Sequence, residues 1–335
     1  MTAPRVSILL PAFDAEATLA AALQSVVRQR ETRWECVVVD DGSRDGTRAL
    51  AVEVARCDPR VRVLGTPHRG LVCALNTGLA ACRGETVARM DADDLMHRDR
   101  LGAQLAALAA APALAAVGTH VRVFPRAGLR DGLRAYEAWL NGIDSARRVR
   151  EEAFVECPVA HPTLMVRGAL LHGLGYRDAG WPEDYDLILR LLAAGHEVGV
   201  VARRLHAWRD GPARLTRTGD VYRADRFTRL KAAFLADGFL RASDTYVLWG
   251  HGGTGRRLRR ALAAYGKRVS HVVEVHPRRI GQSIDGAPVV PIEDLTRLRG
   301  RPLVASVAGA RARRLIRERL DLLGFRETVD FVCAA

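Results

Sequence analysis

Short apolar segments alternate with helix-forming segments along the first part of the chain. Residues 6–10, 36–39, 61–64 and 86–90 are rich in apolar residues, and each is followed by Pro, Gly or Asp, as strands are. The segments between them carry leucine and valine at helical spacing. Alternating strands and helices build a mostly parallel sheet with helices on both faces, so the predicted fold class is α/β.

Acidic residues follow two of these predicted strands. The sequence Asp-Asp-Gly-Ser occupies 40–43, and Asp-Ala-Asp-Asp occupies 91–94. Ligands of such sheets bind beyond the carboxyl ends of the strands, so both motifs are expected at one edge. Three neighbouring carboxylates repel one another unless a cation lies among them, and Mg²⁺ prefers carboxylate oxygens shared with substrate phosphates. Residues 91–94 therefore indicate a metal–diphosphate site; the alternative is an acidic turn that caps the next helix.

The charge of the chain favours acidic partners. Its net charge of +13 is carried almost wholly by arginine, because Lys231 and Lys267 are the only lysines. A basic surface attracts nucleotide phosphates, anionic membranes or nucleic acid. Nucleic acid is the weakest of these, since aromatic residues are only 6% of the chain and no basic run is interleaved with them. We expect a phosphate-bearing small molecule, with peripheral association with an anionic membrane as a second option.

Cysteines and apolar runs indicate a cytoplasmic protein. The six cysteines are scattered without a C-x-x-C pair, which argues against a zinc site or a disulfide framework and for a reducing compartment. The chain begins with a strand pattern rather than a signal peptide. The longest apolar run, 105–117, is shorter than the ~20 residues that a membrane helix needs. We expect a cytoplasmic location, with at most peripheral contact at the inner face of the membrane.

Five motifs follow one another in order along residues 5–215. They are Val-Ser-Ile-Leu-Leu-Pro-Ala-Phe at 6–13, Val-Val-Val-Asp-Asp-Gly-Ser at 37–43, Asn-x-Gly at 76–78, Asp-Ala-Asp-Asp at 91–94 and Glu-Asp-Tyr-Asp-Leu at 183–187. Together they resemble family 2 glycosyltransferases with the GT-A fold. The resemblance implies inverting transfer of a sugar from an NDP-sugar, UDP-sugar first, to a hydroxyl of a saccharide, glycolipid or natural product. The Gln-x-x-Arg-Trp motif of processive members is missing, which favours a single transfer.

The same resemblance implies a nucleobase pocket at the first two strand ends. Pro11 and Phe13 would bracket the base, although Phe13 also suits a buried aromatic at a strand end. Asp41, or its neighbour Asp40, would accept a hydrogen bond from the base edge; a plain turn is the alternative. Arg69 lies where relatives often place a base or phosphate contact.

For the diphosphate, the resemblance implies a Mg²⁺ or Mn²⁺ ion. Asp93 is the expected ligand, with Asp91 in support, and Asp94 is expected only to cap the following helix. His206 is a further candidate for the metal. Arg209 is expected in a mobile basic loop that closes over the diphosphate.

On the acceptor side, the resemblance implies that Asp184 is the base. Inverting transfer needs a base that takes the acceptor's hydroxyl proton. Glu183 would position the acceptor or the base, and Trp181 would supply an apolar wall that makes the carboxylate more basic. His161 is either an acceptor-pocket residue or a structural histidine.

A smaller α/β domain is predicted at residues 244–335, after a glycosyltransferase domain at 1–217 and a helical connector at 218–243. The connector is amphipathic, so it either lies on an anionic membrane or packs between domains. A G-x-G-x-x-G turn follows an apolar strand pattern, and an acid lies about 20 residues further on, as in dinucleotide-binding folds. The residues of this second nucleotide site are Gly250, Gly252, Gly255 and Glu274. The segment resembles the Rossmann-like nucleotide-binding domain of sugar-modifying acyltransferases, in which ligand binding and simple packing both occur.

Three other functions compete with sugar transfer. A nucleotidyltransferase would need a glycine-rich basic phosphate loop after the first strand, and residues 10–13 are Leu-Pro-Ala-Phe. A dehydrogenase would rest on the turn at 250–255 alone. A non-catalytic nucleotide-sugar-binding or regulatory protein would be expected to lose Asp93 or Asp184, and both are present. A metal-dependent glycosyltransferase is therefore the leading hypothesis.

Overall fold

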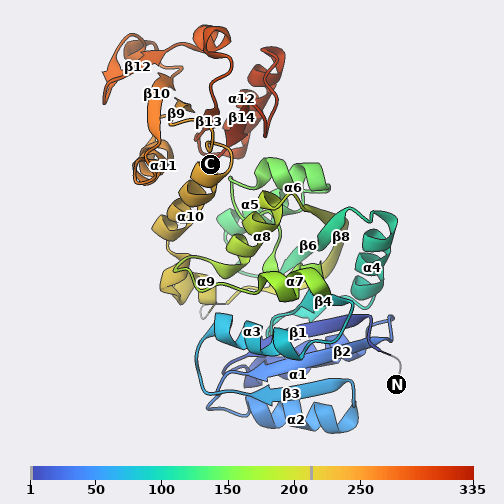
Figure 1. Cartoon of the computed structure of the whole chain (residues 1–335). Coiled ribbons are helices and arrows are strands. Elements are labelled where there is room, and N and C mark those ends of the chain that lie inside the picture. Colours follow the sequence, from blue (N-terminus) through green and yellow to red (C-terminus); the bar gives the residue numbers. More distant parts are fainter. Residues whose placement is uncertain (1–2, 212–213) are drawn as a thin grey trace. The chain divides into compact units, whose positions relative to one another are not determined.

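A computed structural model describes residues 3–211 and 214–335, and the chain divides into two compact units (Figure 1). The first unit consists of Met1–Val149, Val159–Ala179 and Glu183–Arg214. The second consists of Arg150–Pro158, Gly180–Pro182 and Leu215–Ala335. Two short segments from the first two-thirds of the chain therefore belong to the second unit.

The first unit is built on an eight-stranded mixed sheet with the strand order β3-β2-β1-β4-β7-β6-β8-β5. Its strands are β1 (Val6–Ala12), β2 (Trp34–Asp40), β3 (Val61–Gly65), β4 (Thr86–Arg89), β5 (Leu95–Met96), β6 (Leu114–Phe124), β7 (Met165–Arg167) and β8 (Glu197–Arg209). Its helices are α1 (Glu16–Val27), α2 (Thr47–Cys57), α3 (Leu71–Ala81), α4 (Arg100–Ala110), α5 (Asp131–Leu140), the short 3-10 helix His161–Thr163, α7 (Gly168–Leu174) and α8 (Glu183–Ala193). Helix α9 (Leu215–Thr218) belongs to the second unit. The α/β prediction is confirmed.

Strands β1 and β2 are buried along their whole length, because helices cover both faces of the sheet, as in parallel sheets generally. Ile8 and Leu10 point to one face and pack with Leu23 of α1. Leu9, on the opposite face, lies against α3, where a Cβ built on Gly78 would come 2.4 Å from its side chain. The alternation of the two faces follows from the two-residue period of a strand.

The strand order puts a topological switch point between β1 and β4. Strands β1 to β4 are parallel to one another, and β7 is antiparallel to both β4 and β6. The chain adds β2 and β3 on one side of β1 and then returns to add β4 on the other side. At such a switch point the loops diverge and leave a crevice beyond the carboxyl ends of the strands. The motif at 6–13 ends at this switch point, and the motif at 91–94 follows the end of β4 there.

Two segments differ from the sequence prediction. The glycine- and arginine-rich sequence of residues 126–134 is typical of an exposed loop, but α5 begins at Asp131 and buries Leu140. The short apolar segment at 198–201 predicts only a short strand, but β8 continues to Arg209, which pairs with Phe124. Exposed residues in the middle of β8 and shifts of its register hide the alternation that would have revealed its length.

The second unit is built on a smaller sheet with the strand order β11-β12-β10-β9-β13-β14. Its strands are β9 (Thr245–Trp249), β10 (Arg268–Val273), β11 (Ser283–Ile284), β12 (Ala287–Val290), β13 (Leu303–Ala305) and β14 (Phe331–Cys333). Its helices are α10 (Ala224–Asp237), α11 (Gly253–Ala263), α12 (Ala310–Leu322) and the short 3-10 helices Asp220–Tyr222, Pro277–Arg279 and Ile292–Leu298. All pairs except β11–β12 are parallel.

Helix α10 and residues 150–158 complete this second unit. The apolar side of α10 packs with β9 and α11 in one core, in which Ala232 and Leu235 are fully buried. This side is therefore part of a core and not a free membrane-binding surface. Helix α6 (Ala146–Glu152) ends in this unit, where Arg317 bonds both Glu152, at 2.8 Å, and Glu327. Such a buried charge cluster fixes the segment 150–158 in place.

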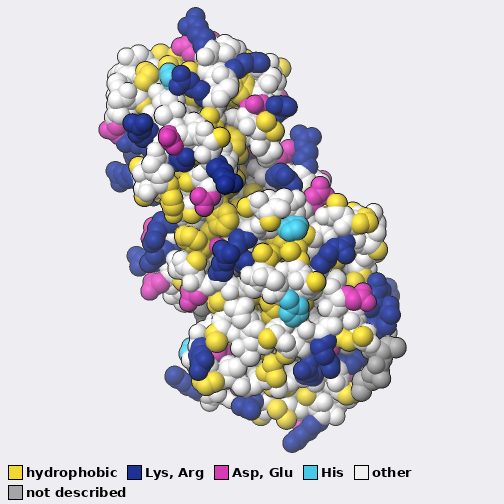
Figure 2. Space-filling model, viewed as in Figure 1, with side chains coloured by type: hydrophobic (Ala, Val, Ile, Leu, Met, Phe, Trp, Pro, Cys, Tyr) yellow, Lys and Arg dark blue, Asp and Glu magenta, His cyan; other side chains and the backbone are white. Residues whose placement is uncertain are grey.

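The surface carries mixed charge. Lys and Arg side chains are spread over the whole visible face, with Asp and Glu among them (Figure 2). Within the described residues, no helix is long and apolar enough to cross a membrane.

Candidate active site

Three carboxylates meet at the end of β4. One oxygen from each of Asp91, Asp93 and Asp94 lies within 4.8 Å of the others. Burial, together with the charges of Asp91 and Asp94, raises the pKa of Asp93 to about 7. A set made only of carboxylate oxygens, with an excess of negative charge, fits Mg²⁺ or Mn²⁺.

Asp94 takes a structural position in this group. It has no exposed surface, and its carboxylate accepts hydrogen bonds from His206 Nε2 at 2.7 Å and from the Arg209 backbone N–H at 2.6 Å. The expectation that Asp94 caps the next helix is wrong, because α4 begins only at Arg100. Asp91 and Asp93, both partly exposed, are left as the candidate metal ligands.

A buried polar chain continues from Asp94 through His206 into the core. Arg100 Nη1 lies 3.1 Å from His206 Nδ1. Since arginine only donates, Nδ1 accepts, and the proton on Nε2 is directed at Asp94. Arg100 Nε donates the next hydrogen bond to Gln104 Oε1, and Gln104 Nε2 donates to the Thr163 carbonyl oxygen. Both ring nitrogens of His206, which the sequence left as a candidate metal ligand, are therefore engaged by protein groups, so His206 anchors the loop that carries Asp91, Asp93 and Asp94.

We expect His206→Ala to destabilise the protein by about 3 kcal/mol, because it leaves the buried Asp94 and Arg100 without a shared partner. Measured as a thermal midpoint, this corresponds to a fall of roughly 6–12 °C for a domain of this size. The matched control is His172→Ala, at an exposed position, which should change the midpoint little. A midpoint for His206→Ala equal to that control would show that the chain does not anchor the loop.

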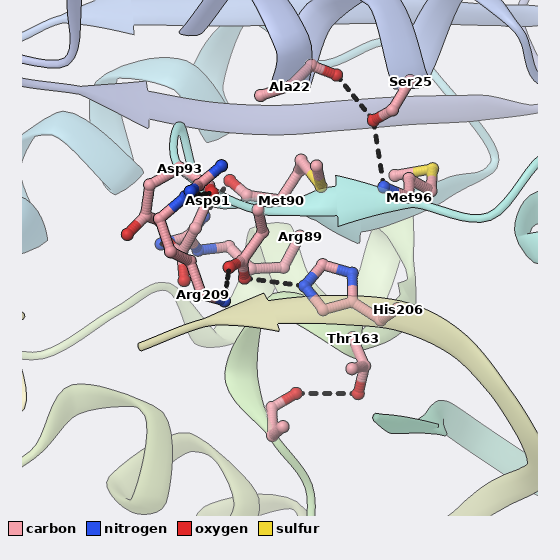
Figure 3. Close-up of polar contacts among 12 residues, drawn as sticks. Ala22, Ser25, Arg89, Met90, Asp91, Asp93, Met96, Thr163, His206 and Arg209 are labelled. Carbon is pink, nitrogen blue, oxygen red and sulfur yellow. Dashed lines mark hydrogen bonds and ion pairs between the residues drawn. The ribbon is translucent and has the colours of Figure 1, made fainter. Parts of the chain in front are cut away.

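Arg209 lies at the carboxylate cluster and not in a mobile loop. It is the last residue of β8, and its Nε donates to the Asp93 carbonyl at 2.6 Å. Its guanidinium carbon also lies 4.5 Å from the ring centre of Phe124. Figure 3 shows Arg209 beside Asp91 and Asp93. These contacts hold the positively charged guanidinium of Arg209 next to the candidate metal ligands.

Arg89 is a site residue that the sequence reasoning missed. It lies on β4 with 3% of its surface exposed, and its Nη2 donates to Asp91 at 2.6 Å. Burial opposes its charge, but Asp91, Tyr176 and Glu183 outweigh that effect and raise its pKa. An arginine inside an otherwise apolar strand was the available signal. Arg89 therefore connects the Asp-Ala-Asp-Asp motif at 91–94 with the motif that begins at Glu183.

The candidate base pocket is formed by Phe13 and the buried carboxylate of Asp41. Phe13 is 39% exposed and stacks on His68 with ring centres 4.0 Å apart. Asp41 accepts hydrogen bonds from the backbone N–H groups of Arg69, at 3.0 Å, and Gly70, at 2.9 Å, while its Oδ2 lies 2.9 Å from His68 Nδ1. Arg69 thus contributes its backbone, and its side chain is exposed. His68 was not anticipated.

The turn after β2 needs a glycine to form this pocket. Gly42 has φ +73°, and a Cβ there would come 2.7 Å from the His68 backbone nitrogen. A side chain would therefore push the His68 loop away. Asp40 accepts a bond from the Ser43 N–H at 3.1 Å, and Pro11 is buried beside it, paired with Val39.

His161, Tyr176 and Glu183 form a second buried group. His161 Nδ1 lies 3.7 Å from Glu183 Oε1, and its Nε2 lies 3.3 Å from the Tyr176 hydroxyl. Burial and the charge of Arg89 lower the pKa of His161 well below its usual value, so the imidazole is neutral. Asn76 bonds both the N–H and the carbonyl of Tyr176 at 2.9 Å. The Asn-x-Gly motif thus fixes one wall of this group.

Asp184 lies in the first turn of α8, half-buried, with Oδ1 accepting from the Tyr185 N–H at 2.7 Å. Its charge and that of Glu183 act with burial to raise the pKa of Tyr176. Trp181 is half-buried and belongs to the short segment Gly180–Pro182 of the second unit. The four residues proposed for a second nucleotide site also lie in that unit: Gly250, Gly252, Gly255 and Glu274.

The family model described as "Glycosyl transferase family 2" matches residues 7–171. Two curated relatives extend this finding. The putative glycosyltransferase EpsE of Bacillus subtilis is 30% identical over 230 residues, which are 66% of this chain and 79% of that protein. The Escherichia coli UDP-Glc:alpha-D-GlcNAc-diphosphoundecaprenol beta-1,3-glucosyltransferase WfgD is 36% identical over 101 residues, which are 30% of this chain and only 39% of that protein.

Solved structures show the same fold. The S. aureus TarS fragment 1–349 in complex with UDP-GlcNAc has a TM-score of 0.56 and 17% identity, with 78% of this chain and 71% of that chain covered. The mannosyltransferase PcManGT from Pyrobaculum calidifontis, in complex with GDP-Man and Mn²⁺, has a TM-score of 0.51 and 23% identity, with 72% and 65% covered. Together with the match to EpsE and the strand-end motifs, these findings show that the chain belongs to glycosyltransferase family 2.

Proposed function

We propose that the first unit transfers a sugar, by an inverting and metal-dependent mechanism, from an NDP-sugar to a hydroxyl of a saccharide or lipid-linked acceptor. The observation that carries this proposal is the position of three elements around one strand switch point. These are the Asp91–Asp93 carboxylates, the Phe13–Asp41 pocket, and the helix start with Glu183 and Asp184, which Arg89 couples electrostatically to Asp91.

The donor is bound by two of these elements. The nucleobase of the donor lies against Phe13, and the N–H on its edge is directed at the acidic pair Asp40–Asp41. Backbone N–H groups hold the carboxylate of Asp41 in place. Asp91 and Asp93 hold Mg²⁺ or Mn²⁺, which neutralises the diphosphate leaving group. Arg209, beside Asp93, adds a positive charge for the same phosphates. A uridine diphosphate is the first choice, because WfgD is named for UDP-Glc and TarS was solved with UDP-GlcNAc.

In the transfer step, Asp184 takes the proton of the acceptor hydroxyl. The acceptor oxygen forms its bond to the anomeric carbon on the face opposite the diphosphate, and the bond from that carbon to the diphosphate oxygen breaks. The configuration is therefore inverted and the nucleoside diphosphate leaves. Glu183, held near the neutral His161, orients the acceptor.

The test of donor class is a hydrolysis and transfer assay of the full-length protein with UDP-, GDP-, ADP- and dTDP-sugars. We expect release of nucleoside diphosphate from a UDP-sugar in Mn²⁺ or Mg²⁺, with loss of at least about 10²-fold in EDTA, because the metal neutralises the leaving group. The anomeric configuration of the product is read by NMR. Equal rates with and without metal, or retention of configuration, would contradict the proposal.

The second unit has no part in this chemistry in our proposal. Its likeness to the nucleotide-binding domain of sugar-modifying acyltransferases stays a prediction.

A further inference from the structure

The sheet of the second unit has its own switch point. Its parallel strands are ordered β12-β10-β9-β13-β14, so the chain adds β10 and β12 on one side of β9 and then crosses to add β13 on the other. The crevice expected from this order lies beyond the carboxyl ends of β9 and β13. This position is independent of the first unit and of the function proposed for it.

The glycine turn lies at this switch point, against the end of β13. Gly250 has φ +94°, and a Cβ on it would come 2.3 Å from Val307. A Cβ on Gly255 would come 2.1 Å from the Gly250 carbonyl oxygen. Both glycines are thus required by close packing, which draws the first turn of α11 onto the strand ends. Gly252, between them, has open space where a Cβ would be.

Two helices begin at this edge without a side-chain cap. α11 follows Gly252 and α12 follows Gly309, and neither has a capping side chain or an acidic residue in its first turn. Arginines occupy early positions instead, among them Arg256 and Arg311. Positive side chains at a helix N-terminus are repelled by the positive end of the helix dipole. An anion bound there would be stabilised both by the dipole and by the arginines.

Buried polar atoms without a partner lie in the same loops. Ser306 is 1% exposed, and within the described residues its hydroxyl has no hydrogen-bond partner. Its carbonyl accepts from Thr254 of α11, so it directly adjoins the glycine turn. The Nε2 atom of His251, inside the turn, is also buried and has no hydrogen-bond partner among the described residues. Burial and three nearby arginines lower the pKa of His251, so its neutral ring keeps hydrogen-bonding capacity. These atoms indicate a polar ligand.

We propose that the second unit binds a nucleoside diphosphate group at this switch point. The diphosphate lies on the backbone N–H groups of residues 252–255 at the start of α11. The ribose hydroxyls bond to Glu274, which follows β10 and forms a 3.1 Å ion pair with Arg279. The nucleobase lies over Val275, an apolar side chain that is 63% exposed. ADP, UDP and NAD⁺ share this chemistry, and they differ only in the base and in the group attached to the second phosphate.

The test compares two substitutions at the open position Gly252 in the full-length protein. Gly252→Asp places a carboxylate where the phosphate would lie and is also a favoured helix cap. Gly252→Ala adds a methyl group without charge and is the matched control. Binding of ADP, UDP and NAD⁺ is measured by titration calorimetry in EDTA, which weakens the metal-dependent donor site of the first unit.

We expect at least one of the three nucleotides to bind wild type and Gly252→Ala with similar affinity. Gly252→Asp should weaken that binding at least about tenfold, since a like charge replaces the favourable helix terminus. Its thermal midpoint without ligand should equal or exceed that of Gly252→Ala, which excludes misfolding as the cause. Inorganic pyrophosphate should compete with the nucleotide.

Two results would overturn the proposal: no binding of any of the three nucleotides, or equal binding by Gly252→Asp and Gly252→Ala. In the second case the heat would come from another site. Neither result would touch the sugar-transfer proposal, which is tested by metal-dependent donor turnover.

Discussion

Replacement of Asp184 by asparagine is expected to lower kcat for sugar transfer by about 10³-fold, because a positioned general base contributes roughly 10²–10⁴-fold. Asparagine keeps the shape of the side chain and can still accept the bond from the Tyr185 N–H, so α8 should remain in place. It has no basicity to remove the acceptor proton. Donor affinity should stay within about twofold, since the base acts on the acceptor and its interaction is made in the transition state.

The measurements are transfer kinetics with a saturating acceptor and titration calorimetry with the nucleoside diphosphate and Mn²⁺. The same substitution at exposed Asp178 is the matched control, because it removes a nearby charge without touching α8. Wild-type turnover in Asp184→Asn would remove Asp184 as the base. A loss of both turnover and donor affinity would instead point to a collapse of the pocket.

The order of the first elements in the first unit was predictable because β1, β2 and β4 are buried along their whole length. Segments such as 36–39 read as continuous apolar runs, and the helices between them show regular spacing. The long β8 escaped prediction, since its central residues are exposed and its register against β6 shifts. The boundary between the units was also hidden, because residues 150–158 join the second unit through side-chain contacts of Glu152 that no local pattern encodes.

Within the candidate site, the sequence names residues that belong to short local motifs and does not name residues whose role depends on long-range contacts. Asp91, Asp93 and Asp184 are named by their motifs. Arg89 couples two motifs far apart in the sequence, and His68 reaches Asp41 and Phe13 only once the loops have folded. The same physical reason explains the error at Asp94, whose partner His206 is 112 residues away. A local sequence pattern identifies residues that are close together in the chain. A buried polar pair such as Asp94–His206 forms only when the tertiary structure brings distant residues together.

Replacement of Asp93 by alanine is expected to abolish metal-dependent turnover, with a loss of about 10³-fold or more, because it removes a ligand of the ion that neutralises the leaving group. The fold should survive. Burial and its acidic neighbours raise the pKa of Asp93 from its usual value to about 7, so its ionised form opposes folding. That cost is full above pH 7 and fades as the pH falls toward the unfolded-state pKa of ~3.9.

At pH 8 and without metal, Asp93→Ala should therefore melt at or above the wild-type temperature. Added Mn²⁺ should raise the melting temperature of the wild type and not that of the variant. Asp91→Ala is the informative comparison, because it also leaves the buried guanidinium of Arg89 without its carboxylate partner and should lower stability as well as activity. If Asp93→Ala turned over donor at the wild-type rate, or if Mn²⁺ stabilised it as much as the wild type, the metal site would have to be sought elsewhere. A stable but inactive Asp93→Ala beside an unstable and inactive Asp91→Ala would separate the ligand that only binds metal from the one that also completes the buried charge pair.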